Sequence, residues 1–318
     1  MTVPGPAIPL LSRVAEHLYW SARYLERASG SARVLRAYSD TLVDLPRSVA
    51  SSWEPLLAIP GSRERFDQKY DQPDEISVMT FLVADEDNPG SIVSSILQAR
   101  ANLRTVREVI PETTWRVLND LGLFVTGDRS DGVRRRSRPR FFERVIADCE
   151  RVEGVRVATM LRDDAYELMR LGQAIERADM TTRVLAVRAN YLMGEPEALG
   201  SHHEVQWMGV LRSLAAFQAF QRSTREPISG EAVLSFVLHN RSFQRSVAAC
   251  LHRVTQAVSA LPPAPEIIDE AKRIEADLEA IGERPLDGKS LDDAMDAVQR
   301  GLGSIHRRVG AAYFHRGD

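Results

Sequence analysis

The chain has 318 residues, 44% of them hydrophobic, which is enough for one large or two ordinary domains with buried cores. Its formal net charge of −3 at pH 7 argues against a nucleic-acid-binding protein, which normally carries a large basic excess. The two cysteines support neither a disulfide framework nor a zinc site, and the lack of a run of about 18 apolar residues argues against a membrane span. We therefore expect a cytoplasmic protein.

The first predicted element is one long amphipathic helix over residues 12–44. Apolar residues recur along one side at steps of three and four: Val14, Leu18, Leu25, Ala28 and Ala32. The opposite side carries an aromatic and charged stripe made of Glu16, Tyr19, Trp20, Arg23, Glu26 and Arg27. This stripe either packs against neighbouring helices as a satisfied charge network or faces a ligand, and plain exposure to solvent is the third alternative.

Further helices are predicted over residues 52–69, 73–85, 89–110 and 111–122, and a linking helix is predicted over 140–160. A basic run, VRRRSRPRFFERV at residues 133–145, follows the loop-like segment TGDRSDG. Such runs are usually solvated or mobile. The alternative is electrostatic docking of an acidic partner surface or an anionic ligand, for which the candidates are Arg134, Arg135, Arg136, Arg138 and Arg140.

The second half of the chain is predicted to be helical as well, over residues 161–193, 203–224, 229–239, 242–261, 264–281 and 289–314. No stretch shows sustained strand alternation between turn signals. The pattern therefore favours an all-α helical bundle.

Three blocks of the first half recur in the second half in the same order. Residues 24–35 and 174–185 are identical at six of twelve positions, and Trp53 with Leu57 and Phe66 recurs as Trp207 with Leu211 and Phe220. The segment FLVAD at 81–85, followed by Ser-Ile, recurs as FVLHN at 236–240, followed by Ser-Val. This order predicts an internal duplication, with one helical unit at 1–126, a basic loop and linking helix at 127–157, and a second unit at 158–318.

The repeated Glu-Arg dipeptide indicates a contact between the two units. Glu26 could pair with Arg23 on its own helix, but Glu176 has Gln173 at the corresponding place. A local ion pair cannot explain both acids, so we expect each of them to reach an arginine of the other unit.

The copies also differ along the stripe, because Glu16, Trp20 and Arg23 align with Tyr166, Arg170 and Gln173. A ligand site, if one exists, should therefore be asymmetric and richer in the first unit. There Arg23 and Arg27 would bind a carboxylate or phosphate while Glu26 orients an amine.

Three separated segments resemble the Alpha-E family of bacterial α-helical domains. They are LSRVAEHLYWSARYLERASGSARVL at 11–35, YELMRLGQAIERADMTTRVL at 166–185 and SFVLHNRSFQRSVAACL at 235–251. The resemblance implies an α-helical protein associated with circularly permuted ATP-grasp ligases and transglutaminase-like proteins, and sometimes with a proteasome-like peptidase. It thus implies a peptide- or amide-modifying system in which a peptide is the candidate substrate.

Three functions are compatible with these observations. The chain is an accessory component that docks with those partners, an enzyme of the same amide-bond pathway, or a homo-oligomeric scaffold without a ligand. In the enzyme, Glu26 or Glu176 would act as acid or base, and the ligand-binding candidates are Glu16, Tyr19, Trp20, Arg23, Arg27, Arg177 and Arg183. No cofactor or metal is expected, because no phosphate-binding loop and no Glu-x-x-His pattern is present.

Overall fold

A computed structural model describes residues 10–44, 52–59, 62–194, 203–282 and 288–314. Every regular element in these ranges is helical, which confirms the predicted all-α class. Residues 1–9 and 315–318, which the predicted units include, lie outside the described residues. No helix in the described ranges is long and apolar enough to cross a membrane.

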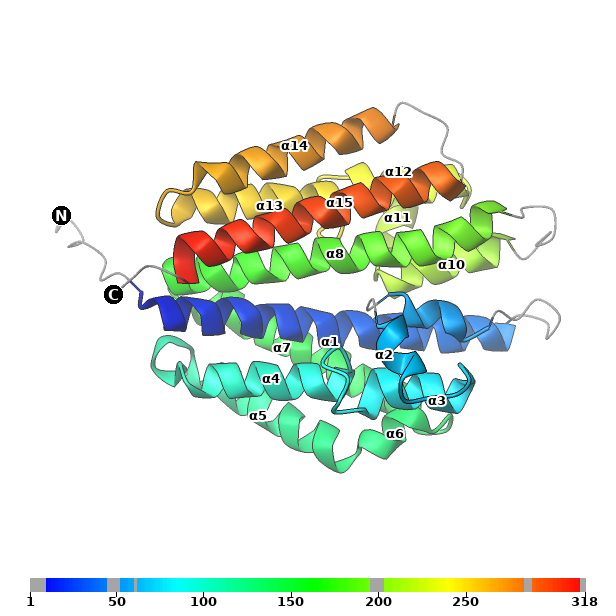
Figure 1. The fold of residues 1–318 in the computed structure, drawn as a ribbon, viewed down its shortest axis with the longest axis horizontal. Coiled ribbons are helices and arrows are strands. Elements are labelled where there is room, and N and C mark those ends of the chain that lie inside the picture. The colour runs from blue at the N-terminus through cyan, green and yellow to red at the C-terminus, as the bar shows by residue number, and fades with distance from the viewer. Residues whose placement is uncertain (1–9, 45–51, 60–61, 195–202, 283–287, 315–318) are drawn as a thin grey trace.

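Two long helices, α1 (Ser12–Asp44) and α8 (Asp164–Gly194), form the centre of the fold. They lie side by side and run in the same direction (Figure 1). Gly172 permits their close approach, because a Cβ atom at this position would lie 2.3 Å from the backbone oxygen of Tyr19. Eight residues further along α8, the side chain of Met180 lies over Gly30 of α1. The two helices are thus held in a fixed register.

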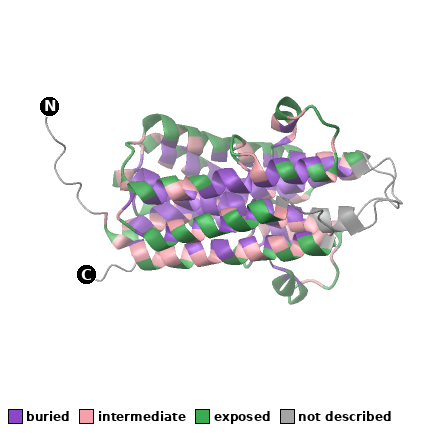
Figure 2. Cartoon of the chain, turned by 90° about the horizontal axis from the view of Figure 1, so that it is seen from above, coloured by how far each residue is buried: buried purple, intermediate pink, exposed green. Residues whose placement is uncertain are grey.

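A group of three helices flanks each long helix. Helices α4 (Ile92–Arg104), α5 (Glu112–Gly127) and α7 (Arg138–Thr159) lie on the side of α1, and α13 (Val247–Ala260), α14 (Pro265–Gly282) and α15 (Gly288–Val309) lie on the side of α8 (Figure 1). Two helices of each group pack directly against the long helix, α4 and α7 against α1 and α13 and α15 against α8, and the third helix of each group packs on those two. The buried apolar side chains of both groups form one contiguous core. Figure 2 shows this burial concentrated along the central helices, with exposed residues on the outer helices.

Shorter helices connect these long ones. They are η1 (Glu54–Leu57), α2 (Arg63–Asp67), α3 (Glu75–Met79), η2 (Thr80–Ala84), η3 (Arg107–Val109), α6 (Arg129–Val133), α10 (His203–Ser213), α11 (Phe217–Ser223), α12 (Gly230–His239) and η5 (Gly310–Phe314). The predicted single helix over 52–69 is wrong, since η1 and α2 are separate there. The predicted helix over 203–224 is interrupted at Ala215, which has a φ angle of 52°. The segment predicted as a loop before the basic run contains α6.

Candidate functional site

Ion pairs link α1 to α8 in a reciprocal way. Arg27 Nε donates to Oε1 of Glu176 at 2.5 Å, and Arg177 Nη2 donates to Oε2 of Glu26 at 2.7 Å. Arg23 gives Glu176 a second partner, with 2.7 Å between Nε and Oε2. The prediction that each acid reaches an arginine across helices is confirmed.

Glu26 receives two further donors, one from α8 and one from outside the two long helices. Arg245, which lies just before α13, donates to Oε1 of Glu26, and Gln173 Nε2 donates to Oε2 at 3.3 Å. Arg177 also contacts Glu153 of α7, at 3.1 Å. The Glu-Arg network, defined as Arg23, Glu26, Arg27, Glu176, Arg177 and Arg245, therefore ties together α1, α7, α8 and the start of α13.

The two carboxylates of this network are almost completely buried, with 4% of Glu26 and 1% of Glu176 exposed. Burial by itself raises the pKa of a carboxyl group, but Arg177 and Arg245 outweigh it and hold the pKa of Glu26 well below its usual range. At Glu176 burial is likewise outweighed, and its arginine partners lower the pKa to about 2. Both acids are ionised at neutral pH and saturated with donors, so neither is placed to exchange a proton with a substrate.

The aromatic part of the stripe packs against the C-terminal helix. Tyr19 Oη bonds to Nδ1 of His306 at 2.9 Å, and the rings of Trp20 and His306 meet edge to face with centroids 5.0 Å apart. Burial raises the pKa of Tyr19 to about 12 and, together with the charge of Arg23, lowers the pKa of His306 to about 4. Tyr19 is fully buried, whereas Glu16 at the start of the stripe is half-buried. The stripe therefore acts here as a packing surface for α15.

Two of the ligand-binding candidates, Arg27 and Arg183, line a small cleft of about 190 Å³. Arg27, Glu176 and Arg183 contribute to its wall, together with residues around Pro89. Arg183 pairs with Asp179 on its own helix, with 2.8 Å between Nε and Oδ2. Each charged candidate in this cleft thus already has a partner of opposite charge.

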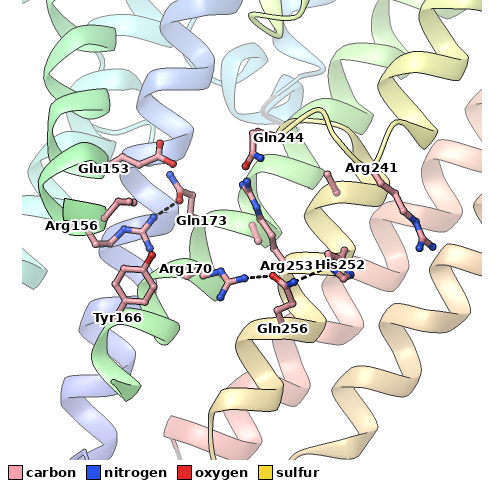
Figure 3. A pocket seen from close by; sticks show the side chains of 13 residues that line it. Glu153, Arg156, Tyr166, Arg170, Gln173, Arg241, Gln244, His252, Arg253 and Gln256 are labelled. Carbon is pink, nitrogen blue, oxygen red and sulfur yellow. Dashed lines mark hydrogen bonds between the residues drawn. The ribbon is translucent and has the colours of Figure 1, made fainter. Parts of the chain in front are cut away.

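A larger cleft of about 450 Å³ opens between α7, α8 and α13 (Figure 3). It adjoins the Glu-Arg network through Glu153 and Gln173, and its wall includes Arg156, Tyr166, Arg170, Arg241, His252, Arg253 and Gln256. None of these residues was predicted from the sequence to belong to a functional site. The available signal was the divergence of the copies, because Tyr166, Arg170 and Gln173 are the α8 residues that align with the stripe of α1. The larger cleft therefore lies beside α8, whereas the sequence predicted a ligand site richer in residues of the stripe on α1.

The basic run splits into one buried and several exposed arginines. Arg138 is 5% exposed, lies 2.9 Å from Glu75 through Nη2, and donates to the backbone oxygen of Val133. Arg135 pairs with the same carboxylate from the surface, and the exposed members of the run are Arg134, Arg135, Arg136 and Arg140. Of the five docking candidates, Arg138 is thus a buried structural residue and is not available to a partner.

The two cysteines lie inside the bundle. Cys149 and Cys250 are both free and buried, and burial raises the pKa of Cys250 to about 11. Neither thiol has the low pKa of a nucleophile. Within the described ranges, no three His, Cys, Asp or Glu side chains are grouped so that they could hold a metal ion.

The sequence matches the model of the Alpha-E family, a predicted α-helical domain with a conserved ER motif, over residues 10–314. It is similar to the uncharacterized protein Mb2597 of Mycobacterium bovis, at 26% identity, and to the uncharacterized protein Rv2567 of Mycobacterium tuberculosis, at 25% identity. Each similarity covers 79% of this chain but 30% of the relative, so the chain spans less than a third of the length of these proteins. No solved structure matches the chain.

Proposed function

The chain belongs to the Alpha-E family, and from this premise we propose that it is a non-catalytic accessory component of a bacterial peptide- or amide-modifying system. Its partners in this proposal are an ATP-grasp ligase and a transglutaminase-like protein, and a peptide is the candidate substrate. One observation carries the non-catalytic role: the two candidate catalytic acids, Glu26 and Glu176, are buried and paired with arginines.

The same observation argues against the enzyme alternative. General acid-base catalysis is most effective when the pKa of the group lies near the working pH. The pKa values of Glu26 and Glu176 are instead held far below neutral pH by their arginine partners, against the opposing effect of burial. The Glu-Arg network is better suited to fixing the positions of four helical segments, because breaking a buried ion pair is strongly destabilising.

The length of the relatives supports an accessory role. The similarity covers only 30% of each mycobacterial protein, so the matching region is joined there to a much longer stretch of chain. A helical unit that works beside other parts of a larger protein, or beside separate partners, is compatible with this arrangement.

We place partner docking on the exposed part of the basic run, at Arg134, Arg135, Arg136 and Arg140. A cluster of exposed guanidinium groups attracts an acidic surface and speeds association at low ionic strength. The proposed setting is the cytoplasm, and the two free buried cysteines are compatible with a reducing compartment.

We further propose that the accessory unit arose by internal duplication. The reciprocal pairs support this, because Glu26 contacts Arg177 and Glu176 contacts Arg27, and the two glutamates, like the two arginines, are 150 residues apart. The third repeated block gives independent support, since the Oγ of Ser91 caps α4 and the Oγ of Ser246 caps α13 in the same way. The proposed boundaries stay at 126–127 and 157–158.

Reconstitution tests the accessory role. The ligase and the transglutaminase-like protein are incubated with ATP and candidate peptides, with and without this chain, and product is followed by mass spectrometry. We expect the chain to raise the yield only when the ligase is present, and Glu26→Gln to retain this effect per folded molecule. Product formation by this chain and the peptide alone, abolished in Glu26→Gln, would replace the accessory role by the enzyme alternative.

A binding measurement tests the docking surface. Arg134→Ala/Arg135→Ala/Arg136→Ala should weaken partner binding at low salt, and the difference from the wild type should shrink as salt rises. Arg222→Ala/Arg225→Ala, which removes two exposed arginines from another part of the surface, is the control. Equal binding by all three proteins at every salt concentration would remove the docking assignment.

A further inference from the structure

The cleft between α7, α8 and α13 carries more positive than negative charge. Four arginines line it, at positions 156, 170, 241 and 253, against one carboxylate, that of Glu153. Glu153 already forms an ion pair with Arg177 of the Glu-Arg network, at 3.1 Å. The arginines must therefore be neutralised by residues outside the lining or remain unpaired.

Two of these arginines have partners behind the wall of the cleft. Arg170 lies 3.0 Å from Glu167, one turn earlier on α8, and Arg241 lies 3.9 Å from Glu275 of α14. Arg170 also donates to Oε1 of Gln256, across the cleft on α13 (Figure 3). These two side chains are held in place by groups of the protein itself.

Arg156 and Arg253 differ from them, because no carboxylate in the described ranges lies within ion-pair distance of either one. Arg156 is 5% exposed and donates through Nη2 to Oε1 of Gln173 at 2.7 Å, while its buried Nη1 has no acceptor. Arg253 is half-buried. Figure 3 shows the two side chains on opposite walls of the cleft, Arg156 from α7 and Arg253 from α13.

This arrangement costs free energy when the cleft is empty. Burial lowers the pKa of both Arg156 and Arg253, and the charges of Arg177 and Arg170 act in the same direction, while the charge of Glu153 opposes them without reversing the shift. Burying a charge without a partner is unfavourable, and gathering like charges adds repulsion. An anion between the walls would remove both penalties at once.

We propose that this cleft is a binding site for a small oxyanion-bearing ligand, with Arg253 as the main contact and Arg156 as the second source of positive charge. A volume of about 450 Å³ falls within the usual range for small-molecule sites, about 300–1,000 Å³. The ring of Tyr166, which lies against the guanidinium of Arg156, and the side chains of Gln173 and Gln256 add neutral groups to the walls of the cleft. The site does not depend on the accessory role, since it would bind whether or not the chain works beside a ligase.

Carboxylates and phosphates share the chemistry that guanidinium groups recognise, namely two or more acceptor oxygens on one charged centre. The test therefore uses inorganic phosphate, the peptide acetyl-Ala-Ala-Glu with free carboxylates, and the same peptide with both carboxylates amidated. The charged peptide and phosphate distinguish the two sources of the oxyanion. The amidated peptide is the neutral control.

Binding of the three probes to the full chain is measured by calorimetry at low ionic strength. We expect at least one charged probe to bind, and the amidated peptide not to bind. Arg253→Gln should weaken binding by roughly tenfold or more, because a charge-assisted hydrogen bond is lost. Arg222→Gln, which removes the same charge from the exposed end of α11, should bind like the wild type.

Thermal melting separates a ligand role of Arg253 from a structural one. Without a probe, Arg253→Gln should melt no lower than the wild type, because it relieves repulsion and removes a half-buried charge. The proposal is overturned if neither charged probe binds at millimolar concentration, if Arg222→Gln and Arg253→Gln weaken binding equally, or if Arg253→Gln melts well below the wild type. A failure of the ligase reconstitution would leave all of these results unchanged.

Discussion

Replacing Glu26 by Gln tests whether the Glu-Arg network stabilises the bundle. The substitution keeps the size of the side chain and one acceptor oxygen but removes the charge that Arg177 and Arg245 share. Arg177 is only 3% exposed, and after the substitution Glu153 is its remaining carboxylate partner. Arg245 loses the ionised acceptor that it has in the wild type.

The expected loss in the free energy of unfolding follows from the burial of Glu26. Removing one partner of a buried ion pair typically costs about 3–5 kcal/mol, because the other charge remains in a poorly solvated site. Glu26 is 4% exposed, so water cannot replace the lost carboxylate. We expect Glu26→Gln to lower the free energy of unfolding by about 3 kcal/mol, at the lower end of that range, because glutamine retains an acceptor oxygen.

Urea unfolding followed by far-UV circular dichroism measures this change. The comparison requires that the unfolding free energy of both proteins falls with urea concentration at the same slope. The control is Glu54→Gln, the same substitution in the exposed pair between Glu54 and Arg63, for which we expect no measurable shift of the urea midpoint. If the midpoints of Glu26→Gln and Glu54→Gln agree with each other, the network is not a buried stabilising element and the reasoning is refuted. A double-mutant cycle with Arg177→Gln then gives the coupling energy of the pair itself.

Three further predictions concern the same bundle. The pKa values of Glu26 and Glu176 lie below the ordinary glutamate value of 4.5, so the ion pairs stabilise the fold fully above about pH 4.5, and this stabilisation is lost as the pH falls toward about 2. Measuring the urea midpoint over this pH range checks the prediction. Gly172→Ala should destabilise by about 1–3 kcal/mol in urea unfolding because its Cβ would meet the backbone of α1, whereas Gly154→Ala, with open space around it, should not destabilise. Cys149 and Cys250, buried and with raised pKa values, should react with a thiol reagent only under unfolding conditions, and rapid native labelling would contradict this.

The long helices could be predicted from the sequence because their apolar periodicity is maintained over many turns. Residues 12–44 and 161–193 were expected to be helical, and α1 and α8 occupy nearly the same ranges. The errors fall where backbone geometry changes within a helical pattern. Ala215 interrupts the predicted helix over 203–224 with a positive φ angle, which is unusual for a residue other than glycine. Alanine gives no signal of a break, since it is the residue that favours helices most strongly.

The contact between the Glu-Arg dipeptides could be predicted because two similar segments of the sequence contain the dipeptide and can be compared. Gln173 at the place of Arg23 excluded a common local pair, and this left a partner on another helix as the remaining explanation. The cleft could not be predicted in this way, because its walls come from α7, α8 and α13. Arg156 and Arg253 are nearly 100 residues apart in the sequence, and only the packing of their helices brings them to one site.

Trp20 of α1 and Arg170 of α8 have neighbours of different chemistry. They are 150 residues apart, the same offset that separates Glu26 from Glu176. In one place Trp20 and His306 are aromatic, with ring centroids 5.0 Å apart, and they fill the space between α1 and α15. In the other place Arg170 and Arg156 are both cationic and line an open cleft between α8 and α7. Aromatic rings attract one another and close the gap, whereas two guanidinium groups repel and leave room for an anion. This difference in side-chain chemistry gives a physical reason why the larger cleft lies between α7, α8 and α13 and not between α1 and α15.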